Sequence, residues 1–337
     1  MTPTTFADIL PISPISSHTY SLILEDAWCI GTVPNGGYTT SAFLICARTH
    51  MQCTHPTRSQ PHPINLHLEF LRRTAVGPAT FTVRDTKLGS RISNLHLTLY
   101  QNNNTALPIV EGYIIMSNLS SETGLSLDTS YKLHPPPLPA HLPTLISAGE
   151  DTNYCLRHGE PFPKFRRAAL NVRMYLVKPS ARPPDRPRSV GDQWIRFYPL
   201  QNPNGRWTND ALGFLVDLFP QIIEQYHNTV AEEAAITETD MDKLRKIVKE
   251  NESTTTYWYP TLALNLDVKK LLPDEGVELL FVRVQAKLVR NGRFDLDVSV
   301  WDEGGEMVAH SVHASLVMDT SRNLTRKENG QKSGSKL

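Results

Sequence analysis

One carboxylate stands in an otherwise apolar stretch, and it is the first candidate for chemistry in this chain. Asp217 lies within Leu215-Val216-Asp217-Leu218-Phe219, inside a segment whose apolar pattern predicts a helix. An ionised carboxylate in apolar surroundings costs free energy unless it is solvated, paired or functional. Asp217 is therefore either a functional group or a residue on the solvent edge of its helix.

A pair of glycines is the second candidate. Gly36-Gly37 lies in the turn-forming cluster Val33–Tyr38, directly before the apolar stretch Thr39–Met51. The first N–H groups of a helix have no acceptor inside it, and the helix dipole favours negative charge there. Paired glycines are also typical of a plain turn that needs a positive φ. Both interpretations can hold together.

Several other chemistries lack their sequence signatures. His55, His62 and His67 do not have metal-ligand spacing on one helix face, and the four cysteines show none either, so we expect no metal and no cofactor. The chain has no Gly-x-Ser-x-Gly motif of a serine-nucleophile hydrolase, and no dinucleotide fingerprint follows a strand.

The charge and hydropathy of the chain narrow the class of partner. It carries 34 basic and 34 acidic residues, so no overall field favours nucleic acid or an anionic membrane. No apolar run approaches the roughly 20 residues of a membrane-spanning helix, and the N-terminus has no secretory pattern. We expect a soluble intracellular protein with no nucleic-acid partner and no membrane span.

The elements that position these residues occur twice. Ile92–Gln101 and Ile109–Met116 are alternating runs joined by a polar turn, and Phe294–Trp301 and Met307–Met318 repeat the pattern about 200 residues later. Each pair predicts two long antiparallel strands. The repetition predicts a pseudo-dimer with its ligand site between the two copies.

Each copy also has one apolar helix upstream of its strands. The first is Thr39–Met51, which is apolar nearly all round and is therefore expected to be buried. The second is predicted from Ala211 to about His227, with Asn209-Asp210 as its N-cap and a kink or interruption at Pro220. The chain of 337 residues has room for two such units.

These patterns predict four regions. Residues 1–120 form an N-terminal unit, 121–165 a loop-rich linker marked by Pro135-Pro136-Pro137, and 166–320 a C-terminal unit. Residues 321–337 are polar and basic, which predicts a disordered tail. The tail ends in Ser335-Lys336-Leu337, the tripeptide read by the peroxisomal import receptor, so a peroxisomal location is expected.

Several short motifs resemble the acyl-CoA thioesterase II-like family, in the right order over most of residues 15–320. They are Gly36-Gly37, His62-Pro63, His67-Leu68-Glu69-Phe70-Leu71-Arg72-Arg73, Gly89-Ser90-Arg91, Gln101, Gln193-Trp194-Ile195-Arg196, Leu215-Val216-Asp217, Thr261-Leu262 and Gly292-Arg293. The resemblance implies an α+β fold of the double hot-dog type, with two antiparallel sheets each wrapped around one long helix. It is nearest to fungal thioesterase-like proteins, some of which serve secondary-metabolite pathways, and it makes a homo-oligomer possible.

The resemblance also implies roles for three side chains. Asp217 matches the catalytic aspartate that orients or deprotonates water, and Thr261 matches a hydroxyl that holds the same water. The third family position is usually a glutamine and here falls on His313. A neutral imidazole can hydrogen-bond to water or act as a base. It can equally mark altered chemistry or lost hydrolysis, or a strand residue that faces solvent.

By the same resemblance, the thioester carbonyl lies at the start of the first helix. Gly37 N–H is then the oxyanion donor, with Gly36 and Tyr38 contacting substrate, and Gly37 of one half faces Asp217 of the other. Thr39–Ala47 contains no Asp or Glu, which leaves one working site per chain. A basic loop with Lys164, Arg166 and Arg167 either meets the CoA phosphates or is simply solvated.

The function that follows is hydrolysis of a fatty or polyketide-like acyl-CoA to free acid and CoA by water activated at Asp217. Two alternatives remain open at this point. One is a hot-dog enoyl-CoA hydratase or dehydratase of a secondary-metabolite pathway, and the other is a non-catalytic acyl-CoA-binding protein.

Overall fold

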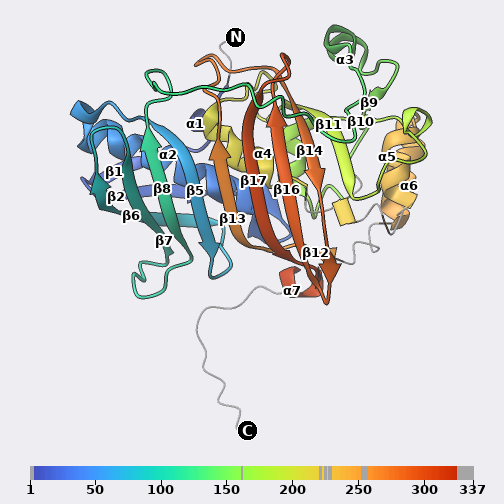
Figure 1. Cartoon of the computed structure of the whole chain (residues 1–337). Coiled ribbons are helices and arrows are strands. Elements are labelled where there is room, and N and C mark those ends of the chain that lie inside the picture. Colours follow the sequence, from blue (N-terminus) through green and yellow to red (C-terminus); the bar gives the residue numbers. More distant parts are fainter. Residues whose placement is uncertain are drawn as a thin grey trace, which may run out of the picture.

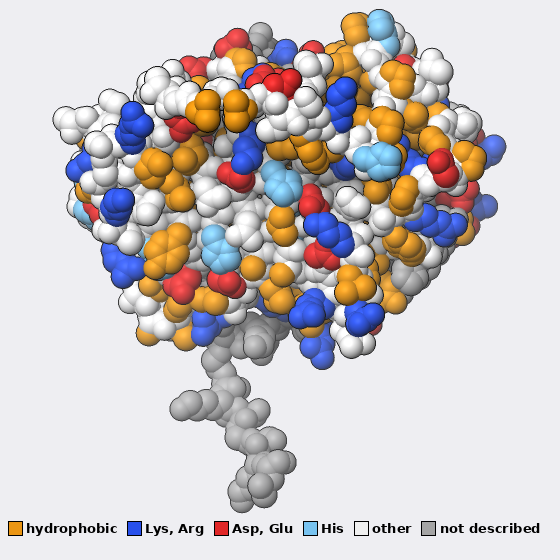
Figure 2. All heavy atoms as spheres, in the orientation of Figure 1, with side chains coloured by type: hydrophobic (Ala, Val, Ile, Leu, Met, Phe, Trp, Pro, Cys, Tyr) orange, Lys and Arg blue, Asp and Glu red, His pale blue; other side chains and the backbone are white. Residues whose placement is uncertain are grey.

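A single antiparallel sheet of 14 strands dominates the structure. The computed structural model describes residues 4–160, 162–219, 222–223, 226, 230–251 and 257–324. The strands curve across one side of the molecule, and the central helices lie behind them (Figure 1). On the face turned to the viewer in Figure 2, charged side chains of both signs are interspersed with apolar ones. None of the helices among these residues is long and apolar enough to cross a membrane.

The first half of the sheet contains the first predicted strand pair. Its strands, in spatial order, are β1 (Ser13–Ser16), β2 (Thr19–Leu24), β6 (Gly77–Leu88), β7 (Ser93–Gln101), β8 (Val110–Ser117) and β5 (His62–Phe70). The helix α2 (Gly36–Thr54) lies against this half, and its residues Gly37–Ala47 are all buried. The short elements are α1 (Phe6–Ile9), β3 (Cys29–Ile30) and β4 (Val33–Pro34).

The second half contains the second predicted strand pair as β17 and β16. Its spatial order is β13 (Thr261–Val268), β17 (Met307–Leu316), β16 (Arg293–Trp301), β14 (Leu279–Gln285), β11 (Val190–Phe197), β10 (Val172–Val177) and β9 (Tyr154–Leu156), with β15 (Val289–Arg290) on β16. Further elements are α3 (Leu142–Ala148), α4 (Leu212–Val216), α5 (Val230–Thr237), α6 (Met241–Asn251), α7 (Ser321–Leu324), β12 (Tyr257–Trp258) and β18 (Met318–Asp319). The linker expected over 121–165 thus carries α3 and β9.

The two halves join edge to edge. Strand β5 pairs with β13 in antiparallel register, with Leu66 opposite Leu266 and His67 opposite Asn265. The His67 and Asn265 side chains also form a hydrogen bond of 2.7 Å. An unpaired strand edge exposes N–H and C=O groups, so this pairing removes one open edge from each half. The double hot-dog architecture is confirmed, with its two sheets fused into one.

The second central helix is shorter than the sequence indicates. A 3₁₀ turn at Asn209–Ala211 leads into α4, which ends at Val216, with Asp217 in the C-cap position. The helix expected to run to about His227 therefore ends at Val216, about eleven residues early. Asp217 already has φ −103° and ψ 17°, outside the α region. An α-helix that continued through residue 220 would bring the ring of Pro220, which lies outside the described residues, against the Val216 carbonyl.

The predicted N-cap of this helix is also wrong. The Asn209 side chain does not cap α4, because it donates to Lys270 O at 2.9 Å and accepts from Leu272 N–H at 2.8 Å. Asn209 thereby ties the start of α4 to the segment after β13.

The two central helices approach at glycines. A Cβ atom on Gly213 of α4 would lie 2.6 Å from Ser41 N of α2, and one on Gly37 would lie 2.6 Å from Gly213 O. Ser41 Oγ accepts the Phe214 N–H at 2.9 Å. The contact between the halves is therefore backbone against backbone, which only residues without a Cβ allow.

The first residues of the predicted disordered tail are part of the fold. Ser321–Leu324 form α7, and Asn323 is fully buried although 321–337 was expected to be disordered. The Asn323 side chain accepts from Thr32 N–H at 2.8 Å and donates to Ile30 O at 2.9 Å. Ser335-Lys336-Leu337 lies outside the described residues, so the import signal stays a prediction.

A buried ion cluster braces β11 against β14. Asp192 and Arg283 lie directly opposite each other on these strands, and the carboxylate accepts from Arg283 at 2.7 and 2.8 Å. Arg186 donates to the same carboxylate, and all three residues are buried. Burying three charged groups is tolerable only while each has its partner.

Replacing Asp192 tests this cluster. Asp192→Ala leaves two buried guanidinium groups without their carboxylate and is expected to lower the free energy of unfolding by about 3–5 kcal/mol. Denaturant unfolding of the purified variant measures this change. Asp242→Ala removes an exposed pair with Arg245 and should cost less than about 0.5 kcal/mol. Equal losses of unfolding free energy in Asp192→Ala and Asp242→Ala would contradict a stabilising role for the buried ion cluster.

Candidate active site

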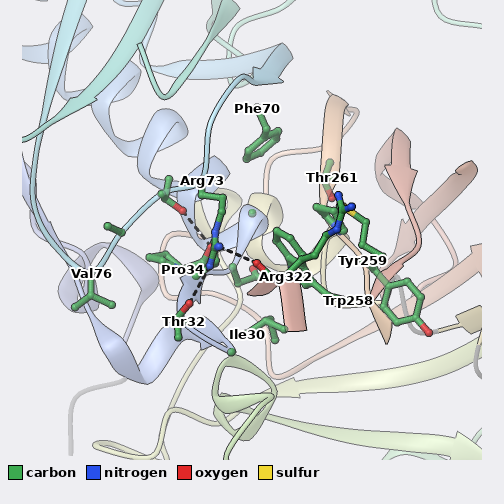
Figure 3. A pocket seen from close by; sticks show the side chains of 18 of the residues that line it. Ile30, Thr32, Pro34, Phe70, Arg73, Val76, Trp258, Tyr259, Thr261 and Arg322 are labelled. Atoms are coloured by element: carbon green, nitrogen blue, oxygen red, sulfur yellow. Dashed lines mark hydrogen bonds between the residues drawn. The ribbon is translucent and has the colours of Figure 1, made fainter. Parts of the chain in front are cut away.

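A large cleft lies where the two halves meet. Its volume is about 2110 Å³, and both halves line it: Asn35, Gly36 and Phe70 come from the first, and Asp217 and Thr261 from the second. The side chains of Phe70, Arg73, Trp258 and Thr261 surround the cleft in Figure 3. A ligand site between the copies was predicted from the repeat, and this cleft occupies that position.

Asp217 is buried in the wall of this cleft, with 3% of its surface exposed. Its Oδ2 accepts the Gly37 N–H at 2.7 Å and lies 3.4 Å from the Asn35 amide nitrogen. Its Oδ1 accepts from Thr261 Oγ1 at 2.9 Å. The carboxylate thus lies at the N-terminus of α2, where the helix dipole stabilises negative charge. A place on the solvent edge is excluded.

His313 on strand β17 completes the group, although it is not among the residues that line the cleft. It is 2% exposed, which excludes the solvent-facing alternative, and its Nδ1 lies 3.4 Å from Asp217 Oδ1. Its Nε2 lies 2.8 Å from Ser311 Oγ. Asp217, Thr261 and His313, which the resemblance associates with one water molecule, therefore do meet in space.

The hydrogen bonds of Ser311 assign the tautomer of His313. The Ser311 hydroxyl donates its one hydrogen to Asn265 O at 2.5 Å, so toward His313 it acts as an acceptor. Nε2 therefore carries a hydrogen. On a neutral ring Nδ1 then presents a lone pair toward Asp217 Oδ1, and this buried atom has no hydrogen-bond partner in the described part of the chain. A molecule that donates two hydrogens would satisfy both acceptors.

Gly36 and Gly37 have different contacts in the structure. The Gly37 N–H is engaged by Asp217 Oδ2, and Gly37 does not line the cleft, so it positions the carboxylate instead of serving as the oxyanion donor. Gly36 lines the cleft, and its N–H has no acceptor among the described residues. A Cβ on Gly36 would lie 2.7 Å from Asp217 Oδ2, so this position also requires glycine.

Tyr38 is a core residue and not a substrate contact. It is fully buried and stacks on Trp28 with ring centroids 5.2 Å apart, and it does not line the cleft. Burial raises the pKa of its hydroxyl, which keeps Tyr38 neutral. The first turn of a helix presents successive residues to different sides, and Tyr38 points into the core while Gly36 faces the cleft.

Two supporting residues escaped the sequence analysis. Asn35 caps α2 by accepting the Tyr38 N–H at 2.9 Å, and its amide also reaches Asp217. An asparagine directly before a helix start is a recognised cap, so this signal was available. Ser311 lies two residues before His313 on the same face of β17, a relation that strand periodicity could have suggested.

The other end of the helix pair has different chemistry. There Arg48 of α2 forms an ion pair of 2.6 Å with the buried Asp210 at the start of α4. Burial raises the pKa of Asp210, and the Arg48 guanidinium opposes that change. This carboxylate is neutralised by its partner, which is consistent with one working site per chain.

Cationic side chains gather at the cleft. Those that line it are Arg72, Arg73, Lys164, Arg166, Arg167 and Arg322, against the carboxylates of Asp26 and Asp217. The guanidinium of Arg73 donates to Thr32 Oγ1 at 2.9 Å and to Arg322 O at 2.8 Å, as Figure 3 shows. Burial lowers the pKa of Arg73, but a guanidinium stays charged at neutral pH.

Two family models match this chain consecutively. The acyl-CoA thioesterase N-terminal domain matches residues 24–117, and the acyl-CoA thioesterase C-terminal domain matches residues 139–317. The chain belongs to the acyl-CoA thioesterase family. It is accordingly an enzyme of the thioester hydrolase class.

A fungal relative matches nearly the whole chain. The thioesterase-like protein TwmA of Talaromyces wortmannii is 33% identical, with 98% of this chain and 95% of TwmA covered. The resemblance to fungal thioesterase-like proteins is thereby confirmed.

Solved structures support the fold. A conserved protein of unknown function with a hot-dog fold from Alicyclobacillus acidocaldarius has a TM-score of 0.64 at 15% identity, covering 93% of this chain and 97% of its own. The acyl-CoA thioesterase II TesB2 of Mycobacterium marinum has a TM-score of 0.55 at 16% identity, and the match covers 94% of this chain and 99% of TesB2.

Adding one methyl group at Gly37 tests the geometry. In Gly37→Ala the new Cβ would lie 2.6 Å from Gly213 O and 2.8 Å from Asp217 Cβ, so α2 and the carboxylate must separate. We expect a loss of about 1–3 kcal/mol in the free energy of unfolding, and at least about tenfold lower thioester hydrolysis. Gly159→Ala, whose Cβ meets its nearest neighbour at 3.4 Å, should leave both quantities nearly unchanged. Full activity in Gly37→Ala would refute the close approach.

Proposed function

We propose that this enzyme hydrolyses an acyl-CoA with a water molecule activated by Asp217. The observation that carries the proposal is the placement of this buried carboxylate. Gly37 N–H fixes Oδ2, while Oδ1 lies between the Thr261 hydroxyl and the unpartnered Nδ1 of His313. A carboxylate held in this way at a cleft wall is positioned to accept a proton from water.

In the proposed reaction, water donates one hydrogen to Asp217 Oδ1 and the other to His313 Nδ1. Its oxygen lone pair then points away from both acceptors and attacks the thioester carbon. Asp217 takes the proton as the new C–O bond forms, and the tetrahedral intermediate collapses by breaking the C–S bond. The departing thiolate receives the proton, giving free acid and CoA.

The developing oxyanion needs a hydrogen-bond donor. We assign this role to Gly36 N–H, which lies at the first turn of α2 beside Asp217 and has no acceptor among the described residues. A backbone N–H held rigidly at a helix N-terminus requires no reorganisation as negative charge develops, which is the basis of oxyanion stabilisation.

The cleft suits the two ends of an acyl-CoA. Apolar side chains that line it include Phe70, Leu218, Trp258 and Tyr259, which can contact an acyl chain. Among the cationic side chains, Arg72, Lys164 and Arg322 are exposed and provide the charge that CoA phosphates require. Arg166 is instead paired with Glu160, and Arg167 with Asp26. The acyl chain is fatty or polyketide-like in this proposal. A role in lipid or secondary metabolism, a peroxisomal location and a homo-oligomer remain predictions.

Release of free thiol from acyl-CoAs of different chain length tests the base. Asp217→Asn keeps the shape of the side chain but removes its basicity, and should lower kcat by about 10²–10⁴. His313→Gln can still hydrogen-bond to water and should retain most of the turnover. Asp267→Asn changes an exposed carboxylate on the same strand as Thr261 and is the control.

The same assay distinguishes the alternatives. Binding of acyl-CoA without thiol release by the wild type would refute hydrolysis and leave a binding or lyase role. Turnover that persists in Asp217→Asn would place the base elsewhere.

The Michaelis constant of an arginine variant tests whether the cationic side chains of the cleft bind CoA phosphates. Arg322 lines the cleft and has an exposed side chain, so Arg322→Ala should raise KM for acyl-CoA about three- to tenfold with little change in kcat. An acyl-pantetheine thioester lacks the nucleotide phosphates, and its KM should not change. Arg245→Ala, on the exposed helix α6, is the matched control. An equal effect on both substrates would contradict phosphate binding.

A further inference from the structure

A second group of chemically active side chains lies at the far end of α2. His50 is near the end of that helix, His55 follows directly after it, His18 is in the turn between β1 and β2, and Asp85 is on β6. One ligand atom from each of these four residues lies within 4.8 Å of all the others. At 1.5 Å per residue, His50 is about 20 Å along α2 from Gly36, so this group is separate from the thioester site.

Three imidazoles converge on one carboxylate through the same ring nitrogen. His50 Nε2 lies 2.9 Å from Asp85 Oδ1, and His55 Nε2 lies 2.7 Å from Asp85 Oδ2. His18 Nε2 lies 3.1 Å from Asp85 Oδ2. Strands β1, β2 and β6 lie at the same end of the molecule (Figure 1). The fold therefore gathers three imidazoles and a carboxylate from segments that are remote in sequence.

The other ring nitrogens of two of these histidines already have partners. His50 Nδ1 lies 3.0 Å from Tyr20 Oη, and Tyr20 Oη in turn lies 3.1 Å from Ser17 O. His18 Nδ1 lies 2.9 Å from Ser17 Oγ. Histidines that bind metals through Nε2 usually have Nδ1 fixed in this way by a hydrogen-bond acceptor, which sets the tautomer and the orientation of the ring.

We propose that His18, His50, His55 and Asp85 bind one divalent transition-metal ion, with Zn²⁺ as the best match. Three imidazoles and a carboxylate are a nitrogen and oxygen ligand set that zinc accepts. Zinc bonds of about 2.0–2.1 Å in a tetrahedron separate the ligand atoms by about 3.3 Å. The observed contacts between imidazole and carboxylate are a few tenths of an ångström shorter, so a small withdrawal of Asp85 makes room for the ion.

The burial of the four residues indicates a structural site with an entry path. The His50 side chain is fully buried, those of His55 and Asp85 are each 18% exposed, and that of His18 is 43% exposed. An ion can therefore enter from the side of His18. Once bound, it would tie the β1–β2 turn to the end of α2 and to β6, stabilising the first half of the molecule.

Sequence spacing gave no indication of this site. We expected no metal because His55, His62 and His67 lack the spacing of a metal motif, and only His55 of these three belongs to the group. Its partner Asp85 lies 30 residues further along the chain, and His18 lies well before it. Only the pairing of β2 with β6 brings these segments together.

The test is metal binding by the full chain carrying no polyhistidine tag. After dialysis against chelator, the protein is equilibrated with Zn²⁺, and bound metal is measured by elemental mass spectrometry. We expect about one Zn²⁺ per chain and a rise in Tm of a few degrees, since a ligand that binds only the folded state stabilises it. Co²⁺ should give the absorption spectrum of a tetrahedral site.

Variants at the two histidines that are only partly buried locate the ion without disturbing the core. His18→Asn and His55→Gln should each weaken binding at least about tenfold and abolish the Tm rise. His310→Gln removes another histidine paired with an aspartate, Asp297 at 2.9 Å, and should behave as the wild type. Substoichiometric binding by folded wild-type protein would overturn the proposal. So would stoichiometric binding that both variants retain. Neither result depends on thioesterase activity.

Discussion

The hydrogen bond from Gly37 N–H to Asp217 Oδ2 is the interaction on which the site depends. It crosses between the two halves of the chain, joining the start of α2 to the end of α4 at 2.7 Å. A carboxylate that is 3% exposed would be costly without such a partner. The backbone donor and the dipole of α2 together offset that cost and leave Oδ1 directed toward Thr261 and His313.

This hydrogen bond is possible only because the helices lack side chains where they meet. Gly37 and Gly213 let α2 and α4 approach backbone to backbone, and Gly36 leaves space for the carboxylate. Strand β5 pairs with β13, which holds the two sheets in one register. This pairing also constrains how closely α2 and α4 can pack. The internal repeat thus produces a site that neither half could form alone. Its asymmetry comes from Asp217, because the opposite end of the helix pair holds Arg48 and Asp210 as an ion pair.

Much of the architecture could be predicted from sequence, because it is encoded locally. The alternating runs at 92–101 and 294–301 predicted the long strands, and the almost uncharged stretch from Thr39 predicted a buried helix. Asp217, Thr261 and His313 were selected by resemblance, and the structure brings them together. The early end of α4 was harder, because apolar periodicity continues past Asp217 while the chain leaves the helix. Tyr38 and the role of Gly37 were misassigned because successive residues at a helix start point in different directions. Gly36 faces the cleft, whereas Tyr38 points into the core. The group formed by His18, His50, His55 and Asp85 was missed because its contacts are tertiary.

In the proposed reaction, Asp217 and His313 hold the attacking water while Gly36 N–H binds the thioester oxygen. A crystal structure with a ketone analogue of acyl-CoA, in which methylene replaces the sulfur, tests it most directly. The carbonyl oxygen should lie about 2.7–3.1 Å from Gly36 N, with a water within hydrogen-bond distance of Asp217 Oδ1 and His313 Nδ1. A carbonyl bound away from Gly36, or an acyl chain that leaves no space for water beside Asp217, would contradict it.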